Sequence, residues 1–230
     1  MAETRFDWCL DGEEAGTTPW EFASITDAGS ADFSLSDAAE HNGTYGYRYT
    51  SGGNANPAYG VYTWTNTDKT EYWVRFYIYI ASGYALNQQT FPAYLVKLLD
   101  GSTVVCEFGI RGNGQTTPNE WGFGLPAALQ YGTANNFSLD AWHLIEIKCL
   151  VDGENGGVAC YIDGSLFKQD LDQAFSLYAD TMHMGYYATS YIASGGTVDY
   201  DDIVGSETQP GAYSDDESGS AVPIILQQMM

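Results

Sequence analysis

The chain has 230 residues and a formal net charge of −22, from 30 acidic and 8 basic residues. Its 18 Tyr, 10 Phe, 6 Trp and 26 Gly, with only 17% charged residues, are typical of an aromatic-rich β protein with many tight turns and argue against disorder. Such an acidic surface repels phosphate backbones and anionic lipid, and no run of about 18 apolar residues is present. We therefore expect neither nucleic-acid binding nor membrane insertion.

Alternation of apolar and polar residues predicts strands along most of the chain. The clearest strand is residues 71–80, EYWVRFYIYI, in which every second residue is apolar from Tyr72 to Ile80. Further strands are expected in residues 44–50, 91–100, 103–112, 142–151, 157–164 and 182–187, separated by turn sequences such as Asp163-Gly164. No long helical pattern competes, and strands with one apolar face must cover that face with a second sheet. The sequence therefore predicts an all-β, antiparallel jelly-roll sandwich over residues 1–205.

The composition changes after this region. Residues 206–220 form a polar, acidic linker, and residues 221–230 close with the apolar sequence AVPIILQQMM. We expect an extended C-terminal tail over residues 206–230. Its apolar end can fold back as an edge strand, dock on another protein subunit as an exchanged arm, or stay disordered.

The four cysteines lack the spacing of a zinc or redox site. Cys149 and Cys160 lie symmetrically about the turn at residues 152–157, where they could face each other across a hairpin. Free buried thiols and a disulfide bridge both remain open.

The second face of residues 71–80 carries aromatic and basic side chains. If the apolar residues point inward, the outward residues of this strand and of the strands at 91–100 and 103–112 include three of the eight basic residues. Aromatic rings stack on sugars, and Arg or Lys grips carboxylate or sulfate groups. The alternative is that these cations only pair with Glu107 and nearby Asp residues. The candidate ligand-binding residues are Trp73, Arg75, Tyr77, Tyr79, Lys97 and Arg111.

An ordered set of motifs resembles the concanavalin A-like lectin/glucanase superfamily, which includes laminin-G-like jelly rolls. The set comprises LDGEEAGTTPW at residues 10–20, AEHNGTYGYRYT at 39–50, EYWVRFYIYI at 71–80, LDAWHLIEIKC at 139–149, GGVACYIDGSLF at 156–167 and GGTVDYDDIVG at 195–205. The motifs W-H-x-I-E-I, Y-I-D-G and D-D-I are the specific part, and the resemblance spans about residues 6–205.

The resemblance also implies a structural calcium ion, because acidic residues of the first and last strands often share one in this family. Carried to this sequence, the ligands are Asp11 and Asp202, with Asp201 and Glu13 in reserve.

Catalysis is not expected from these motifs. Retaining glycosidases of the superfamily carry two acids on one strand, spaced E-x-D-x-E or E-x-D-x-x-E, and this motif is absent. Polysaccharide lyases of this fold need Arg, Gln, His and Tyr on the concave face. The residues that could meet this need are Arg75 and Tyr77 with Tyr94, His143 or Tyr187, and none lies in an expected lyase motif.

Together these features predict a non-enzymatic structural and surface-recognition protein that binds a glycan, including an anionic one. The chain begins at Met1 without a signal peptide and ends in an apolar arm. We therefore expect a subunit of a larger assembly such as a phage virion, as a decoration or fibre protein, located on the virion or an extracellular surface. Residues 221–230 would contact other subunits. The alternatives are a stand-alone lectin-like module and a polysaccharide lyase acting on uronate-containing glycans.

Overall fold

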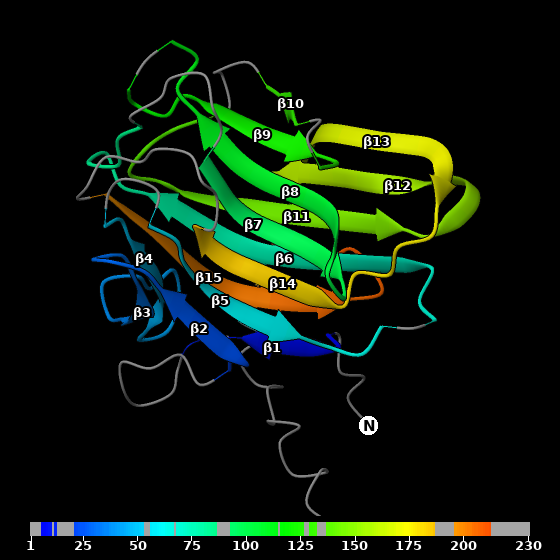
Figure 1. Cartoon of the computed structure of the whole chain (residues 1–230), viewed down its shortest axis with the longest axis horizontal. Helices are drawn as coiled ribbons and strands as arrows, with labels where there is room; N and C mark the ends of the chain where they lie inside the picture. The colour runs from blue at the N-terminus through cyan, green and yellow to red at the C-terminus, as the bar shows by residue number, and fades with distance from the viewer. Residues whose placement is uncertain are drawn as a thin grey trace, which may run out of the picture.

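The computed structural model describes residues 6–10, 12, 21–52, 56–66, 68–86, 93–114, 116–126, 129–132, 137–186 and 196–212. These residues form two antiparallel sheets packed face to face, without a helix, as Figure 1 shows. The all-β jelly-roll sandwich predicted from the sequence is confirmed. Within the described ranges, no helix is long and apolar enough to cross a bilayer.

The first sheet has eight strands among the described residues, in the order β13-β12-β11-β6-β15-β4-β3, with β1 paired to β15. Its strands are β1 (Trp8–Leu10), β3 (Asp32–Ser36), β4 (Gly46–Thr50), β6 (Glu71–Ile80), β11 (Trp142–Leu150), β12 (Asp152–Ile162), β13 (Ser165–Phe175) and β15 (Thr197–Ser206).

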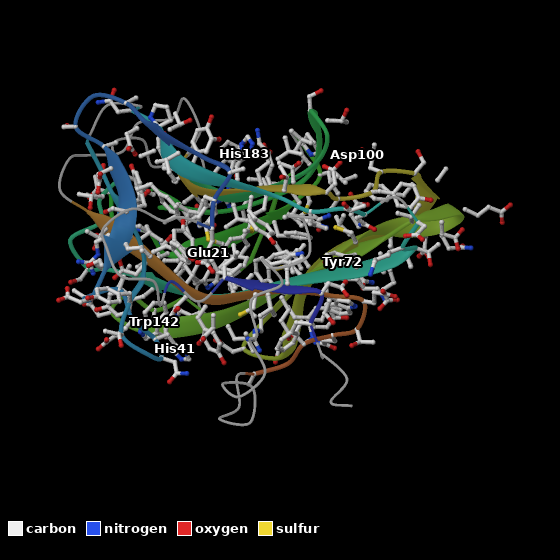
Figure 2. All side chains as sticks on the ribbon, turned by 90° about the horizontal axis from the view of Figure 1, so that it is seen from below. Glu21, His41, Tyr72, Asp100, Trp142 and His183 are labelled. Atoms are coloured by element: carbon white, nitrogen blue, oxygen red, sulfur yellow. The ribbon has the colours of Figure 1, made fainter. Side chains whose placement is uncertain are left out.

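The second sheet has seven described strands in the order β10-β9-β8-β7-β14-β5-β2. They are β2 (Ser24–Asp27), β5 (Ala58–Thr63), β7 (Ala93–Asp100), β8 (Thr103–Arg111), β9 (Glu120–Gly124), β10 (Gln130–Tyr131) and β14 (Thr181–Tyr186). Figure 2 shows the two sheets edge-on, with Glu21 and Tyr72 between them.

The core lies between the sheets and is built from the alternating residues of each strand. Strand β6 turns Tyr72, Val74, Phe76, Ile78 and Ile80 inward, all of them buried, as its sequence predicts. At the centre, the rings of Phe76 and Phe108 join the two sheets with centroids 5.9 Å apart. Burying each such ring contributes about 1.5–3 kcal/mol. The contact between Phe76 and Phe108 therefore stabilises the packing of one sheet on the other.

A tight turn joins β12 to β13. Ile162 pairs with Ser165, so the loop is Asp163-Gly164, and both residues have positive φ, 51° and 75°. Glycine adopts this conformation without strain, which explains the predicted D-G turn. The Asp163 carboxylate accepts hydrogen bonds from Leu144 N at 2.9 Å and contacts His143 Nδ1 at 2.8 Å. Asp163 of the D-G turn therefore connects the β12–β13 hairpin to the start of β11, where the W-H motif lies.

All four cysteines are free thiols. Cys149 pairs with Val158, and Cys160 pairs with Ile147, so the two cysteines do not sit opposite each other across the hairpin. Burial raises the pKa of the Cys160 thiol, which makes it a poor nucleophile.

The chain turns back over the outer face of the first sheet after β15. We call residues 207–212 the strap. Glu146 accepts hydrogen bonds from Gln209 Nε2 at 3.0 Å and from Gly211 N at 2.7 Å, and Arg75 donates to Gly211 O at 3.1 Å. The expected arm at residues 221–230 lies outside the described residues, so its docking and the division at residue 205 stay predictions.

Candidate functional site

The structure divides the six predicted ligand-binding residues between two opposite surfaces. Trp73, Arg75, Tyr77 and Tyr79 lie on β6 of the first sheet, whereas Lys97 and Arg111 lie on β7 and β8 of the second. The expectation of one shared face is therefore wrong, because β6 belongs to the first sheet whereas β7 and β8, which follow it in the sequence, belong to the second.

Most of the β6 candidates are covered. Arg75 is 1% exposed and Trp73 is 4% exposed, and the strap binds directly beside Arg75. Tyr77 is stacked under the ring of His41 with centroids 3.8 Å apart. Tyr79 alone among the four remains half-exposed. This part of the outer face of the first sheet is therefore covered by other segments of the same chain, namely the strap and the loop that carries His41.

The outer face of the second sheet is organised as rows of paired residues across the strands. One row runs from Val61 through His183 and Lys97 to Glu107, on strands β5, β14, β7 and β8. Lys97 Nζ lies 3.8 Å from Glu107 Oε1, and the ring of Tyr59 stacks on His183 with centroids 4.9 Å apart. This row places a cation, an acid and an imidazole next to one another.

A second cluster lies further along β8. Arg111 Nε donates to Glu120 Oε2 at 2.6 Å, and Asn113 Nδ2 donates to Glu120 Oε1 at 2.6 Å. The Arg111 guanidinium also lies 3.5 Å from the centroid of the Tyr131 ring. Arg111 is four residues from Glu107, about 14 Å along an extended strand. We call the surface that includes both clusters the Lys97–Arg111 face; its members are Tyr59, Tyr94, Lys97, Glu107, Arg111, Asn113, Glu120, Tyr131 and His183.

Several titratable groups of this face have shifted pKa values. Burial and the charge of Lys97 lower the pKa of His183, which keeps its imidazole neutral at neutral pH. Burial also lowers the pKa of Lys97, against the opposing effect of Glu107. Burial and the nearby Glu107 raise the pKa of Tyr94. Such concentrations of perturbed groups are typical of functional sites.

The predicted calcium ligands are only partly described. Asp11 and Glu13 lie outside the described residues. The Asp201 carboxylate already accepts hydrogen bonds from the backbone N–H groups of His41, Asn42 and Asp202, at 2.7, 3.0 and 2.8 Å. The Asp202 carboxylate contacts His41 Nδ1 at 2.8 Å. Within the described ranges no group of three acidic, His or Cys side chains could hold a metal. Asp201 and Asp202 therefore do not fit a calcium site by themselves, and calcium stays a prediction.

The residues suggested for lyase chemistry do not come together. Arg75 is buried under the strap, and Tyr94 lies on the second sheet. His143, on β11, pairs with the inward-facing Ile78 of β6. Tyr187 lies outside the described residues.

The sequence reasoning missed His183, Tyr59, Tyr131 and Glu120. His183 stands at the centre of M-H-M-G, a polar residue between two buried methionines, and that alternation marks its outward position. No local signal shows that β5 lies beside β14, which is what brings Tyr59 onto His183.

Comparisons with known proteins support the fold. No protein-family model matches the chain. No curated protein matches it by sequence. Among solved structures, endo-β-1,4-glucuronan lyase from the fungus Trichoderma reesei aligns with a TM-score of 0.64 at 10% identity, covering 88% of this chain and 96% of that one. The cellulose-induced protein Cip1 aligns with a TM-score of 0.65 at 13% identity, covering 90% of this chain and 100% of that one.

A third similar structure is the ligand-binding domain of botulinum neurotoxin serotype D in complex with N-acetylneuraminic acid. Its TM-score is 0.57 at 12% identity, and the match covers 94% of this chain and 50% of that one. These neighbours share the two-sheet sandwich fold of this chain, in agreement with the predicted all-β sandwich. At such low identity the likeness shows the fold alone.

Proposed function

We propose that this protein binds an acidic glycan on the Lys97–Arg111 face without chemically changing it. The observation that carries the proposal is the setting of Arg111. Glu120 takes the Nε donor and Tyr131 supports the guanidinium plane, so the described contacts orient the two Nη groups without using them. A guanidinium fixed in this way is suited to a bidentate contact with a sugar carboxylate.

The rest of the face supports the same ligand class. Lys97 Nζ lies 3.8 Å from Glu107 Oε1 and adds a second positive charge to the face. Tyr59, Tyr94 and Tyr131 are half-exposed and provide rings on which sugars stack. Two of the similar solved structures are a glucuronan lyase and a domain in complex with N-acetylneuraminic acid, both associated with acidic sugars.

Titration calorimetry with glucuronan oligosaccharides tests the proposal. Arg111→Met should weaken binding at least about tenfold, because a charge-assisted contact contributes roughly 1.5–3 kcal/mol. Lys168→Met is the matched control, since it removes one positive charge from β13 in the other sheet. Equal weakening by both variants, or no binding of any acidic oligosaccharide by the native chain, would contradict the proposal.

A second candidate, cleavage of uronate-containing glycans by β-elimination, is favoured by His183. A neutral imidazole beside Lys97 and stacked on Tyr59 combines a base, a carboxylate-neutralising cation and a phenol. In this reaction the base removes the proton next to the uronate carboxyl group, the glycosidic C–O bond breaks, and the leaving oxygen takes up a proton.

The two candidates differ in a simple measurement. Elimination creates an unsaturated sugar that absorbs ultraviolet light, whereas binding alone creates none. Absorbance that rises with the native chain and not with His183→Ala would replace the binding proposal with the lyase. Constant absorbance with measurable affinity favours binding.

A role as a subunit of a larger assembly, such as a virus particle, rests on the sequence of residues 206–230. Light scattering of the full chain and of a version truncated after Ala212, which keeps β15 and the strap, tests it. A large species that becomes a monomer on truncation would support the arm, and monomers in both cases would exclude it.

A further inference from the structure

A second row of polar and aromatic residues crosses the outer face of the first sheet. We call it the Ser34–Trp142 row. Its members are paired partners on adjacent strands, namely Ser34 on β3, Arg48 on β4, Asp199 on β15, Tyr79 on β6 and Trp142 on β11. Four strand spacings make the row about 19 Å long, enough for several linked sugar rings.

Contacts with each other and with neighbouring residues hold the two aromatic rings of the row, Tyr79 and Trp142, in place. Tyr79 and Trp142 have ring centroids 5.6 Å apart and planes inclined by 52°. The Tyr79 hydroxyl donates to Asp140 at 3.2 Å, and the rings of His41 and Trp142 meet at 68° with centroids 5.3 Å apart. Both rings remain half-exposed. Rings that are fixed before binding and still accessible lose little conformational entropy when a ligand stacks on them.

The remaining charges of the row cancel each other. Arg48 Nε and Nη2 donate to the two carboxylate oxygens of Asp199 at 2.6 and 2.7 Å, and Arg48 Nη2 also donates to Ala38 O at 2.7 Å. An anionic ligand would have to compete with Asp199 for this guanidinium. The row therefore disfavours an acidic ligand and suits a neutral one.

We propose that the Ser34–Trp142 row is a second glycan-binding site, for an uncharged sugar chain that stacks on Trp142 and Tyr79. Sugar hydroxyl groups would form hydrogen bonds with Ser34 and with the partly exposed Arg48, which the buried Asp199 holds in place. The site lies on the sheet opposite the Lys97–Arg111 face. Figure 2 shows His183 in one layer, and His41 and Trp142 together at the other. The protein would thus join a neutral glycan on one side to a second ligand on the other.

Titration calorimetry with neutral hexasaccharides tests this site, using cellohexaose, xylohexaose, mannohexaose and laminarihexaose as probes. Trp142→Ala and Tyr79→Ala should each weaken binding of the recognised hexasaccharide at least about tenfold. The matched control is Phe167→Ala, which removes a half-exposed ring from β13 of the same sheet and should leave affinity unchanged. The loss should not depend on salt, because no net charge is involved.

A second variant covers the case in which Trp142→Ala does not fold. Trp142→Phe keeps a ring at this position, so it should retain most of the affinity while losing the change in tryptophan fluorescence caused by the sugar. Absence of binding to all four hexasaccharides overturns the proposal. So does unchanged affinity in folded Trp142→Ala or Tyr79→Ala.

The result is distinguishable from that of the acidic-glycan proposal. Arg111→Met should leave neutral binding intact, and Trp142→Ala should leave glucuronan binding intact. A saturating acidic oligosaccharide should not displace the neutral one. Competition between the two ligands for one site would overturn the inference of a second site.

Discussion

Replacing Arg75 with Met tests whether this residue stabilises the fold, as the structure indicates, or binds a ligand, as the sequence suggests. Arg75 is 1% exposed and donates to Gly211 O at 3.1 Å and Asp202 O at 3.4 Å. It also lies directly opposite Glu146, which is 1% exposed and binds the strap. Methionine keeps much of the aliphatic volume but removes the charge and these two hydrogen bonds.

The expected loss of stability is about 3 kcal/mol. Removing one member of a buried charged pair costs roughly 3–5 kcal/mol, and the low end applies because the strap still donates two hydrogen bonds to Glu146. With a urea m-value of about 3 kcal/mol/M, the unfolding midpoint should fall by about 1 M. Urea unfolding followed by tryptophan fluorescence measures this shift.

Lys69→Met is the matched control for this prediction. Lys69 Nζ contacts both Asp7 and Glu207, so it makes two ionic contacts, but its side chain is 23% exposed. Surface ion pairs contribute about 0–1 kcal/mol, so a much smaller shift is expected. If Arg75→Met stays within about 0.5 kcal/mol of the native chain, or loses glycan affinity at full stability, the structural role is refuted.

Four other expectations follow from pKa values, burial and charge. Burial and the neighbouring Asp202 raise the pKa of Asp201 to about 8, so the folded state favours the protonated carboxyl group. The stability that this protonation contributes is complete below the unfolded pKa of about 4 and is lost as pH rises through about 8. Asp201→Asn should flatten this decline in the unfolding free energy. Lys97→Met should raise the pKa of His183 towards its ordinary value, measured by NMR titration of the imidazole, and an unchanged pKa would contradict the proposed contact. Only the exposed Cys9 should react rapidly with a thiol reagent in the native state, and the other three thiols should react only after unfolding. Affinity for acidic oligosaccharides should rise as salt increases from low to physiological concentration, because screening weakens the repulsion from the net charge of −22 more than it weakens a contact ion pair. A steady fall in affinity with salt would contradict that balance.

Local alternation predicted the strands well because it depends on each strand alone. Residues 71–80 form β6 with the expected inward residues, and residues 103–112 contain β8 with Glu107 and Arg111 on its outer face. The short strands β1, β2 and β10 carry too few residues for a pattern and were not predicted from alternation. The longer strands β3, β5, β9 and β13 were not predicted from alternation either.

Assignment of strands to sheets depends on contacts between distant segments, which alternation does not encode. Strand β6 pairs with β11 and β15, whereas β7 pairs with β8 and β14. The outward faces of β6 and β7, which are neighbours in the sequence, therefore point in opposite directions. Nor does alternation show what covers a face. Arg75 points outward as predicted, yet the strap buries it.

The charge distribution explains how so acidic a chain can present two surfaces to sugars. Arg48 pairs with Asp199 on one sheet, and Arg111 pairs with Glu120 on the other. Each pair leaves its surface locally close to neutral and fixes a guanidinium in one orientation. The difference between the two pairs decides the ligand. Arg48 gives both Nε and Nη2 to its carboxylate, whereas Arg111 gives only Nε among the described contacts. A bidentate pair is already satisfied and suits an uncharged partner, whereas a guanidinium held through Nε keeps its terminal donors for a carboxylate. The same residue types thus support a neutral ligand on the first sheet and an acidic ligand on the second.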